Sequence, residues 1–345
     1  MIKSDKISVH IFLRKPYKFE NHSIEKLFNT ITKDKDNNFK FKFLICPFYS
    51  SGFFKRIFNC FWALFNQGDI NHISGDVNFI SFFLDKNRTI NTFMDCYNLR
   101  QYSGFKKMVY KFFWFYIPIK KSKYITTVSN FTKREIKKLV KTKKKIKVIS
   151  NFIPENNYII KKKNRKKILI IGTTKNKNLD RILLAVKDLK IELIIVGEIN
   201  INQTKFLKSN KIIYKNFINV SESKLINLYN QAKILLFPSL YEGFGLTIIE
   251  AQRMRVPVIT SNISPMKEIV NNSALLVNPK DIKDIRIKLK KLYYNTKLRQ
   301  TIIKKGYINS LNFDPNKFKK KYFYLYEKIF LISSNNYFLK NKDQN

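Results

Sequence analysis

The fold of this chain is decided by the stretch PSLYEGFGLTIIE, which runs from Pro238 to Glu250. It overlaps the end of the apolar run ILLFPS (234–239), typical of a buried strand, and its second half has the apolar spacing of a helix. Gly243 and Gly245 lie between the two, although the chain has only nine glycines in 345 residues. Glycine at such a turn permits positive φ and lets a ligand approach the backbone, and the free amides of the helix N-terminus are suited to phosphate. The stretch therefore predicts an anion-binding turn at the carboxyl edge of a sheet.

Around this stretch the second half of the chain alternates apolar runs with helical patterns. Strands are expected at 167–172, 191–197, 234–239, 256–261 and 274–279, and helices at 179–189 and 221–232. Nearly continuous apolar strands separated by helices indicate a parallel sheet that is covered on both faces. Asn278-Pro279 and Asp314-Pro315 each combine an N-cap residue with proline at the first helical position, and each predicts the start of a helix.

The first half repeats this scheme less regularly. Strands are expected at 8–13, 40–48, 70–74, 89–95 and 124–129, and helices at 23–31, 52–66 and 131–140. The polar run from Pro154 to Lys167 has no periodicity and predicts an interdomain linker. We therefore expect two α/β domains facing a central cleft. Their predicted bounds are 1–154, a linker at 155–166, and 167–314, followed by a helix at 315–333 that packs back on the first domain and a polar tail at 334–345.

Composition narrows the function classes. The formal charge of +43 suggests an anionic partner, but the basic residues are spread along the chain and no recognised nucleic-acid module is present. A nucleic-acid-binding protein is therefore the less favoured of the competing interpretations. The three cysteines have no paired or metal-ligand spacing, which favours a reduced cytosolic compartment. The longest apolar run, Phe112 to Ile119, is far below the ~20 residues that span a bilayer. We expect a soluble or peripheral protein.

The residues 238–262, PSLYEGFGLTIIEAQRMRVPVITSN, closely resemble the signature of the family 4 retaining glycosyltransferases, also called group 1, which have the GT-B fold of two doubly wound Rossmann-like domains. That signature is a Glu-x7-Glu pair, and Glu242 and Glu250 satisfy it. The resemblance runs from about Lys167 to Tyr326. It continues more weakly in the first half.

The resemblance implies a site for a sugar nucleotide in the second domain. Glu250 would hold the ribose hydroxyls, and Glu242 would contact the transferred sugar near the reacting centre. Lys177, in GTTKNKNLD, aligns with the family's diphosphate-binding lysine, and a positioned ammonium would stabilise the departing diphosphate. Backbone amides of the turn would bind sugar hydroxyls and the β-phosphate. The other donor-binding candidates are Gly172, Thr173, Gly243, Phe244, Gly245, Leu246 and Thr247.

The chain also departs from the family pattern. The usual arginine after the first strand of the second domain is replaced by Thr173 and Thr174, with Lys175 as the nearest substitute. In the first domain, Met94 stands before Asp95 where the family often has a histidine. Asp95 and His72 are therefore the catalytic candidates of that domain. A hydrogen-bonded structural residue at a strand end is an equal alternative for His72.

No cofactor or obligatory metal is expected. Asp34 and Asp36 match an Asp-x-Asp metal motif, but no apolar strand leads into them. We predict a retaining hexosyltransferase that uses a nucleoside-diphosphate sugar and a glycan or lipid-linked glycan acceptor, in bacterial surface polysaccharide or glycolipid biosynthesis. It would be cytoplasmic, either free or peripheral on the inner face of the membrane. The alternative is a catalytically idle GT-B protein that binds a partner.

Two segments mix aromatic residues with lysines, Phe53–Phe65 and Phe105–Lys121. Core helices of a doubly wound domain have such faces, and this is the first interpretation. The second is an interfacial surface, where aromatic rings lie at headgroup depth and lysines contact anionic lipid.

Overall fold

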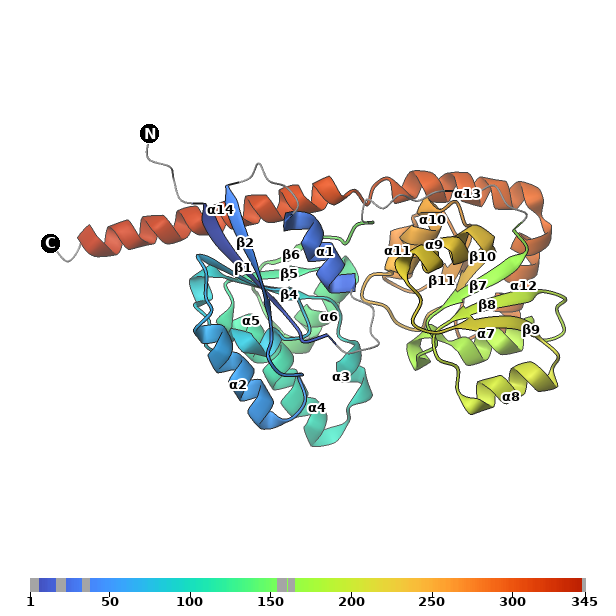
Figure 1. Cartoon of the computed structure of the whole chain (residues 1–345), viewed down its shortest axis with the longest axis horizontal. Coiled ribbons are helices and arrows are strands. Elements are labelled where there is room, and N and C mark those ends of the chain that lie inside the picture. The colour runs from blue at the N-terminus through green and yellow to red at the C-terminus, as the bar shows by residue number, and fades with distance from the viewer. Residues whose placement is uncertain (1–5, 17–22, 33–37, 154–159, 161–164, 343–345) are drawn as a thin grey trace. The chain divides into compact units, whose positions relative to one another are not determined.

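The computed structural model describes residues 6–16, 23–32, 38–153, 160 and 165–342, and it divides into two compact units (Figure 1). Unit 1 comprises Met1–Pro154 and Pro315–Asn345, and unit 2 comprises Glu155–Asp314. Each unit contains one six-stranded parallel sheet with flanking helices, which confirms the predicted α/β class. Most of the predicted linker, 155–166, lies outside the described residues.

The sheet of unit 1 has the strand order β2-β1-β3-β4-β5-β6. Its strands are β1 (Ile7–Leu13), β2 (Phe39–Ile45), β3 (Ile70–Ile73), β4 (Thr89–Phe93), β5 (Tyr124–Thr127) and β6 (Ile146–Val148). The central strand β1 is paired on both sides, so that Val9 aligns with Phe41 of β2 and with Ile70 of β3. The chain therefore changes direction across the sheet between β1 and β3.

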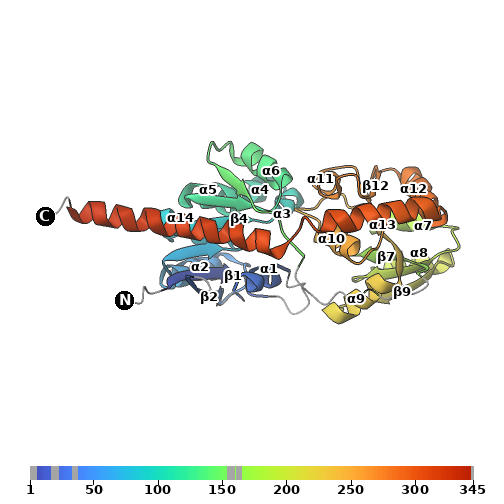
Figure 2. The same ribbon diagram turned by 90° about the horizontal axis from the view of Figure 1, so that it is seen from above.

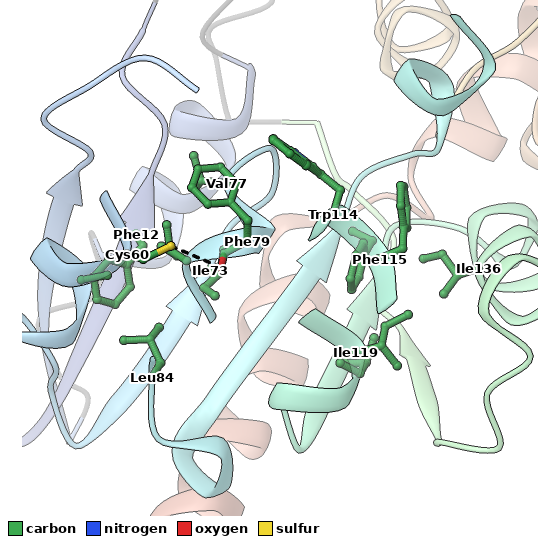
Figure 3. Packing of buried hydrophobic residues seen from close by; sticks show 14 of the residues in the cluster. Phe12, Cys60, Ile73, Val77, Phe79, Leu84, Trp114, Phe115, Ile119 and Ile136 are labelled. Carbon is green, nitrogen blue, oxygen red and sulfur yellow. Dashed lines mark hydrogen bonds between the residues drawn. The ribbon is translucent and has the colours of Figure 1, made fainter. Parts of the chain in front are cut away.

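One face of this sheet carries the larger core of unit 1. Its covering segments are α2 (Phe53–Leu64), η1 (Asn78–Phe82), α3 (Tyr97–Gln101), α4 (Gly104–Lys111), the π-helical η3 (Phe112–Tyr116), α5 (Ile117–Lys121) and α6 (Asn130–Val140). The short helix η2 (Lys86–Arg88) directly precedes β4 and contacts the C-terminal helix. Figure 3 shows Phe12 of β1 near Cys60 and Phe79, with Trp114 and Phe115 farther along the same cluster. The Cys60 thiol donates to the Phe79 carbonyl at 3.6 Å. This core is continuous from the edge strand β2 to the edge strand β6, since Leu44 and Ile146 belong to the same cluster.

The opposite face of the sheet is covered by α1 (Ser23–Thr32) and by the C-terminal helix α14 (Pro315–Lys342). Figures 1 and 2 show α14 running along unit 1. Phe28 of α1 contacts Phe318 and Tyr322 of α14, with ring centroids 6.1 and 5.9 Å apart. The helix begins at Pro315, as its Asp-Pro start predicts, but it continues to Lys342, past the expected end at 333.

The sheet of unit 2 has the order β12-β11-β10-β7-β8-β9. Its strands are β7 (Lys167–Ile171), β8 (Glu192–Val196), β9 (Ile213–Phe217), β10 (Ala232–Phe237), β11 (Val258–Ser261) and β12 (Leu275–Val277). The helical segments are η4 (Lys175–Lys177), α7 (Leu179–Val186), α8 (Ile201–Ser209), α9 (Glu222–Gln231), α10 (Leu246–Arg253), α11 (Met266–Val270), α12 (Ile282–Tyr294) and α13 (Thr296–Ser310). Separate apolar clusters fill the two faces, with α7 and α12 over one and α9 and α10 over the other.

One predicted helix start in unit 2 is wrong. Asn278-Pro279 does not begin a helix, because α12 starts at Ile282 with Asp281 as its N-cap. The Asp281 carboxylate accepts the amide N–H groups of Lys283 at 2.9 Å and Asp284 at 3.1 Å. An aspartate that satisfies two free amides stabilises the start more than the proline alone.

The aromatic segments of unit 1 are not core helices throughout. Helix α2 buries only Asn59, Cys60 and Ala63, and α4 buries none of its residues. Most of the phenylalanines of these helices are exposed. The first interpretation, core helices, is therefore wrong for α2 and α4. It holds only for the segment 114–119, except Tyr116.

Candidate functional site

The site predicted in unit 2 lies at the switch point of its sheet. From β7 the chain builds β8 and β9 on one side, and then returns to place β10, β11 and β12 on the other. In open parallel sheets, ligands bind outside the carboxyl ends of the strands at such a point. Gly172 follows β7 and the turn 238–245 follows β10, so both lie at this edge.

The turn after β10 delivers the chain into α10. Gly245 is the N-cap of α10 with a φ of 112°, a conformation that residues with a Cβ rarely adopt. Gly243, Leu246 and Thr247 are half-buried around it, and Phe244 is buried against Phe313 with ring centroids 5.8 Å apart. The packing of Phe244 on Phe313 holds the backbone of this turn in place. The first amides of α10 have no acceptor within the helix, and they lie at the positive end of its dipole.

Lys177 and Glu242 form an ion pair across the switch point. The Lys177 Nζ donates to Glu242 Oε1 at 2.7 Å, and the two side chains are 22% and 12% exposed. The ammonium also lies over the Phe237 ring, 4.9 Å from its centroid. Gly172 has a φ of 88°, and a Cβ on it would be 2.8 Å from Lys177 Cγ. The absent side chain of Gly172 thus makes room for the stem of Lys177.

Two asparagines that the sequence analysis did not identify hold the loops of this site together. The Asn176 carbonyl accepts the amide of Leu240 at 2.7 Å, and its side-chain Nδ2 donates to the Tyr241 carbonyl at 3.0 Å. Asn178 Nδ2 donates to the carbonyl of Pro238 at 3.0 Å and to the carbonyl of Pro279 at 2.6 Å. Asn178 has a φ of 66°, a region in which Asn is enriched. The sequence signal for Asn178 was its position directly before the helical stretch that begins at Leu179.

Glu250 lies in α10 and is oriented by a buried neighbour. Tyr229 of α9 is 1% exposed, and its hydroxyl donates to Glu250 Oε2 at 3.0 Å. The other carboxylate of the Glu-x7-Glu pair, Glu242, faces Lys177 instead. The Tyr229 hydroxyl thus contacts Glu250, and the Lys177 ammonium contacts Glu242.

Thr173 and Thr174 stand where the family pattern has its arginine, and Lys175 is the nearest basic residue. Thr173 packs against the end of β8, because a Cβ on Gly197 would be 2.7 Å from Thr173 Oγ1. Lys175 is exposed in η4. Thr173 therefore lies at the carboxyl edge as predicted.

His72 does not fit its predicted catalytic role. It is fully buried in β3, with Nδ1 2.7 Å from the Tyr326 hydroxyl and Nε2 2.8 Å from Thr92 Oγ1. Burial lowers the pKa of His72 to about 3, so the ring is neutral at physiological pH. A catalytic side chain must contact substrate. The structural alternative, a hydrogen-bonded core residue, describes His72, and the reason is α14, which covers that face of the sheet.

Asp95 is exposed after β4, where its Oδ1 accepts the Tyr97 amide at 2.8 Å. It borders a small hollow of about 20 Å³ that is also lined by Asp76 and Tyr110. Asp76 pairs with Arg14, which follows β1, at 2.9 Å. This polar edge lies at the β1/β3 switch point of unit 1. Arg14 and Asp76 were not predicted as site residues, although Arg14 directly follows the predicted strand 8–13 and Asp76 follows the predicted strand 70–74 after one glycine.

Among the described residues, no group of His, Cys, Asp and Glu side chains is arranged to hold a metal ion. Asp34 and Asp36 lie outside the described residues. Cys46, Cys60 and Cys96 are buried and free of disulfides. Burial raises the pKa of the Cys46 and Cys60 thiols to about 12, so neither is a nucleophile at neutral pH.

More than half of the chain is similar in sequence to known proteins. Residues 151–308 match the family model of the glycosyl transferases group 1. Over 207 residues, 55% of the chain, it is 30% identical to the O-antigen chain mannosyltransferase RfbU of Salmonella typhimurium, and it spans 56% of that relative's length.

The fold has solved counterparts over nearly the whole chain. Sucrose-phosphate synthase from Thermosynechococcus elongatus superposes with a TM-score of 0.75 at 13% identity, covering 95% of this chain and 100% of that one. Anabaena HepE, solved with UDP and glucose, gives a TM-score of 0.70 at 13% identity, with 91% and 98% covered. The chain therefore has the GT-B fold, and its residues 151–308 are similar to the group 1 glycosyl transferases.

Proposed function

We propose that the chain is a retaining glycosyltransferase of family 4 that transfers a hexose-type sugar from a nucleoside-diphosphate sugar to an acceptor hydroxyl. The observation that supports this most is the Lys177–Glu242 pair, which joins the two loops at the β7/β10 switch point beside the N-terminus of α10. A cation and free helix amides suit a diphosphate, and a neighbouring carboxylate suits sugar hydroxyls and developing positive charge.

Lys177 would receive the negative charge of the leaving diphosphate. Its ammonium is held between Glu242 and the Phe237 ring, so it is positioned before any ligand binds. The amides of Phe244 to Thr247 would take the β-phosphate and sugar hydroxyls, and Gly172 and Thr173 would border the same group. With this charge on the protein, no obligatory divalent metal is proposed.

The two glutamates would divide the donor between them. Glu250 would accept hydrogen bonds from the ribose hydroxyls, and the Tyr229 hydroxyl, which donates to its Oε2, would orient the carboxylate for that purpose. Glu242 would orient the transferred sugar. Its carboxylate would also stabilise positive charge that develops at the anomeric carbon.

Retention of configuration would come from attack on the front face. The bond from the anomeric carbon to the diphosphate oxygen breaks, and the acceptor oxygen forms its bond to that carbon from the same side. A diphosphate oxygen would take the acceptor's proton. Glu242 is then not a covalent nucleophile of the kind that retaining hydrolases use.

The substrates are inferred from chemistry and from the relative. RfbU is named for the transfer of mannose in an O-antigen chain, so a mannosyl donor is the first candidate sugar. The acceptor would be a glycan or a lipid-linked glycan of bacterial surface polysaccharide or glycolipid synthesis. We propose a cytoplasmic location and no specific nucleic-acid partner for the enzyme.

A donor screen followed by product analysis tests this proposal. UDP, GDP and their glucose, galactose and mannose conjugates are screened by thermal shift, because a ligand of the folded state raises the melting temperature by mass action. The donor that shifts the transition is then used for transfer, and the anomeric configuration of the product is read by NMR. No shift with any sugar nucleotide, or a product of inverted configuration, contradicts the proposal.

A further inference from the structure

Unit 1 presents an aromatic surface that its own fold leaves uncovered. We define the aromatic surface as the exposed apolar side chains of residues 53–65, 82–83 and 105–116. Phe54 is 84% exposed and Phe105 is 75% exposed, and neighbouring rings of α2 and η3 are also more than a third exposed. Soluble monomeric domains rarely leave a contiguous apolar patch of this kind in water.

The rings of this surface are connected from one element to the next. Phe61 of α2 stacks on Phe83, with centroids 4.8 Å apart, and Phe83 contacts Phe82 of η1 at 4.8 Å. The ammonium of Lys121, in α5, lies 5.7 Å from the centroid of the Phe82 ring. The Arg56 guanidinium of α2 likewise lies over Trp114 of η3, at 4.6 Å. The patch is therefore one surface on one face of the sheet, the face whose core is drawn in Figure 3.

The charge of this surface has one sign. The segments 53–66, 78–84 and 104–123 contain no Asp or Glu, while their basic residues are Lys55, Arg56, Lys106, Lys107, Lys111, Lys120, Lys121 and Lys123. Lys106 and Lys107 of α4 are exposed beside Phe105. Aromatic side chains at headgroup depth, flanked by lysines that contact anionic lipid, are the properties of an interfacial membrane surface.

A second copy of this chain fits the surface poorly. A two-fold contact would place the patch against itself, so the lysines of α4 would face other lysines. The chain as a whole carries a formal charge of +43, which adds to the repulsion. The partner must instead offer negative charge at its surface and apolar volume beneath it.

We propose that the aromatic surface of unit 1 docks on an anionic lipid bilayer, with Phe54 and Phe105 inserted at headgroup depth and Lys106 and Lys107 on the lipid headgroups. No helix of the described residues is long and apolar enough to cross a membrane. The docking goes beyond sugar transfer and is measured without donor or acceptor, so either proposal can fail alone.

The test uses the full chain with vesicles of phosphatidylcholine alone or with one quarter phosphatidylglycerol. Binding is expected only to the anionic vesicles, and it should fall between 0.1 and 0.5 M salt as the Debye length shortens from about 10 Å. Trp62 and Trp114, the two tryptophans of the chain, both lie at this surface or directly beneath it. Lipids brominated in the upper acyl chain should therefore quench their fluorescence. Anionic binding without quenching would mean that another surface binds, and overturns the proposal.

Two pairs of variants locate the contact. The variant F54S/F105S should weaken vesicle binding at least about tenfold, because two rings leave the interface. The control I201S/I213S, which changes side chains that are 70% and 66% exposed in unit 2, should bind as the wild type does. Melting temperatures of both variants should stay close to that of the wild type, because the replaced side chains lie outside the core.

The lysines have a control of equal charge. The variant K106Q/K107Q should weaken binding about 30-fold, since each lysine near the surface contributes about fivefold. K304Q/K305Q removes two exposed lysines of α13 and should change binding little. If both lysine variants lost the same fraction of their vesicle affinity, the binding would be nonspecific attraction of a cationic protein to anionic lipid. That result would overturn the proposal. A dimer seen by sedimentation without lipid, and lost in F54S/F105S, would assign the surface to a second copy instead.

Discussion

Replacing Gly172 by alanine tests the geometry of the candidate site without removing any functional group. Gly172 has a φ of 88°, and the new Cβ would lie 2.8 Å from Lys177 Cγ and 3.0 Å from Lys177 Cε. Such distances are below van der Waals contact, so the lysine stem must move. We expect the ammonium to leave its position beside Glu242 and Phe237 and to lose its contact with the diphosphate.

The expected magnitudes separate backbone strain from the displacement of Lys177. Strain at a positive φ costs about 1–3 kcal/mol, which lowers the melting temperature of a unit of this size by several degrees. Loss of a hydrogen bond to a charged group costs about 1.5–3 kcal/mol, equivalent to roughly a 10- to 100-fold weaker binding of nucleoside diphosphate. Only the second effect depends on Lys177.

Gly52 provides the matched control. It has a similar φ of 80°, but nothing lies within 4 Å of where its Cβ would be. Gly52→Ala should therefore lose stability and keep the affinity for nucleoside diphosphate. Affinities are measured by calorimetry with whichever of UDP and GDP binds the wild type, and stabilities by thermal unfolding. If Gly172→Ala binds the nucleotide as tightly as Gly52→Ala does, Gly172 does not position Lys177 and the reasoning is refuted.

Three further predictions concern the glutamates, the buried histidine and the core. Glu250→Ala should weaken binding of nucleoside diphosphate by about 1.5–3 kcal/mol, whereas Glu242→Ala should lower turnover and leave that binding nearly unchanged; equal losses of affinity would contradict the division of roles. Because the pKa of His72 falls from its ordinary 6.5 to about 3 on folding, the unfolded chain binds the extra proton. Stability should therefore decline as the pH falls below 6.5, by about 2 kcal/mol at pH 5, and His72→Gln should flatten this slope in denaturant titrations. Trp114→Ala should destabilise unit 1 by about 3–5 kcal/mol, since the ring is buried, while Phe54→Ala should cost less than about 0.5 kcal/mol; similar losses would show that Phe54 is also part of the core.

Much of the fold could be predicted because parallel strands are buried on both faces. The runs at 167–172 and 234–239 are apolar without alternation, and both correspond to central strands of unit 2. The edge strand β9 was not predicted, because two of its five residues, Lys215 and Asn216, are polar and only one of its sides is paired. The start of α10 was predicted correctly because the turn glycine gives a local signal.

The tertiary structure decided which loops meet at the carboxyl edge of the sheet. Lys177 and Glu242 are 65 residues apart, and only the placement of β10 beside β7 brings their loops together. The same holds for Asn178 and the carbonyl of Pro238. A local sequence pattern reports which face of an element is apolar, and it does not report which loops share an edge.

The fate of two features depended on what covers them. For His72 the sequence left a catalytic and a structural role equally open, and for the rings of α2 it favoured burial in a core helix. Helix α14, some 250 positions further along the chain, covers His72 and fills the space around it. No described element covers the outer side of α2 and α4, so their rings remain at the surface. Periodicity determined that these faces are apolar, whereas burial was decided by the long-range packing of the chain, because the partner of an apolar face lies elsewhere in the sequence.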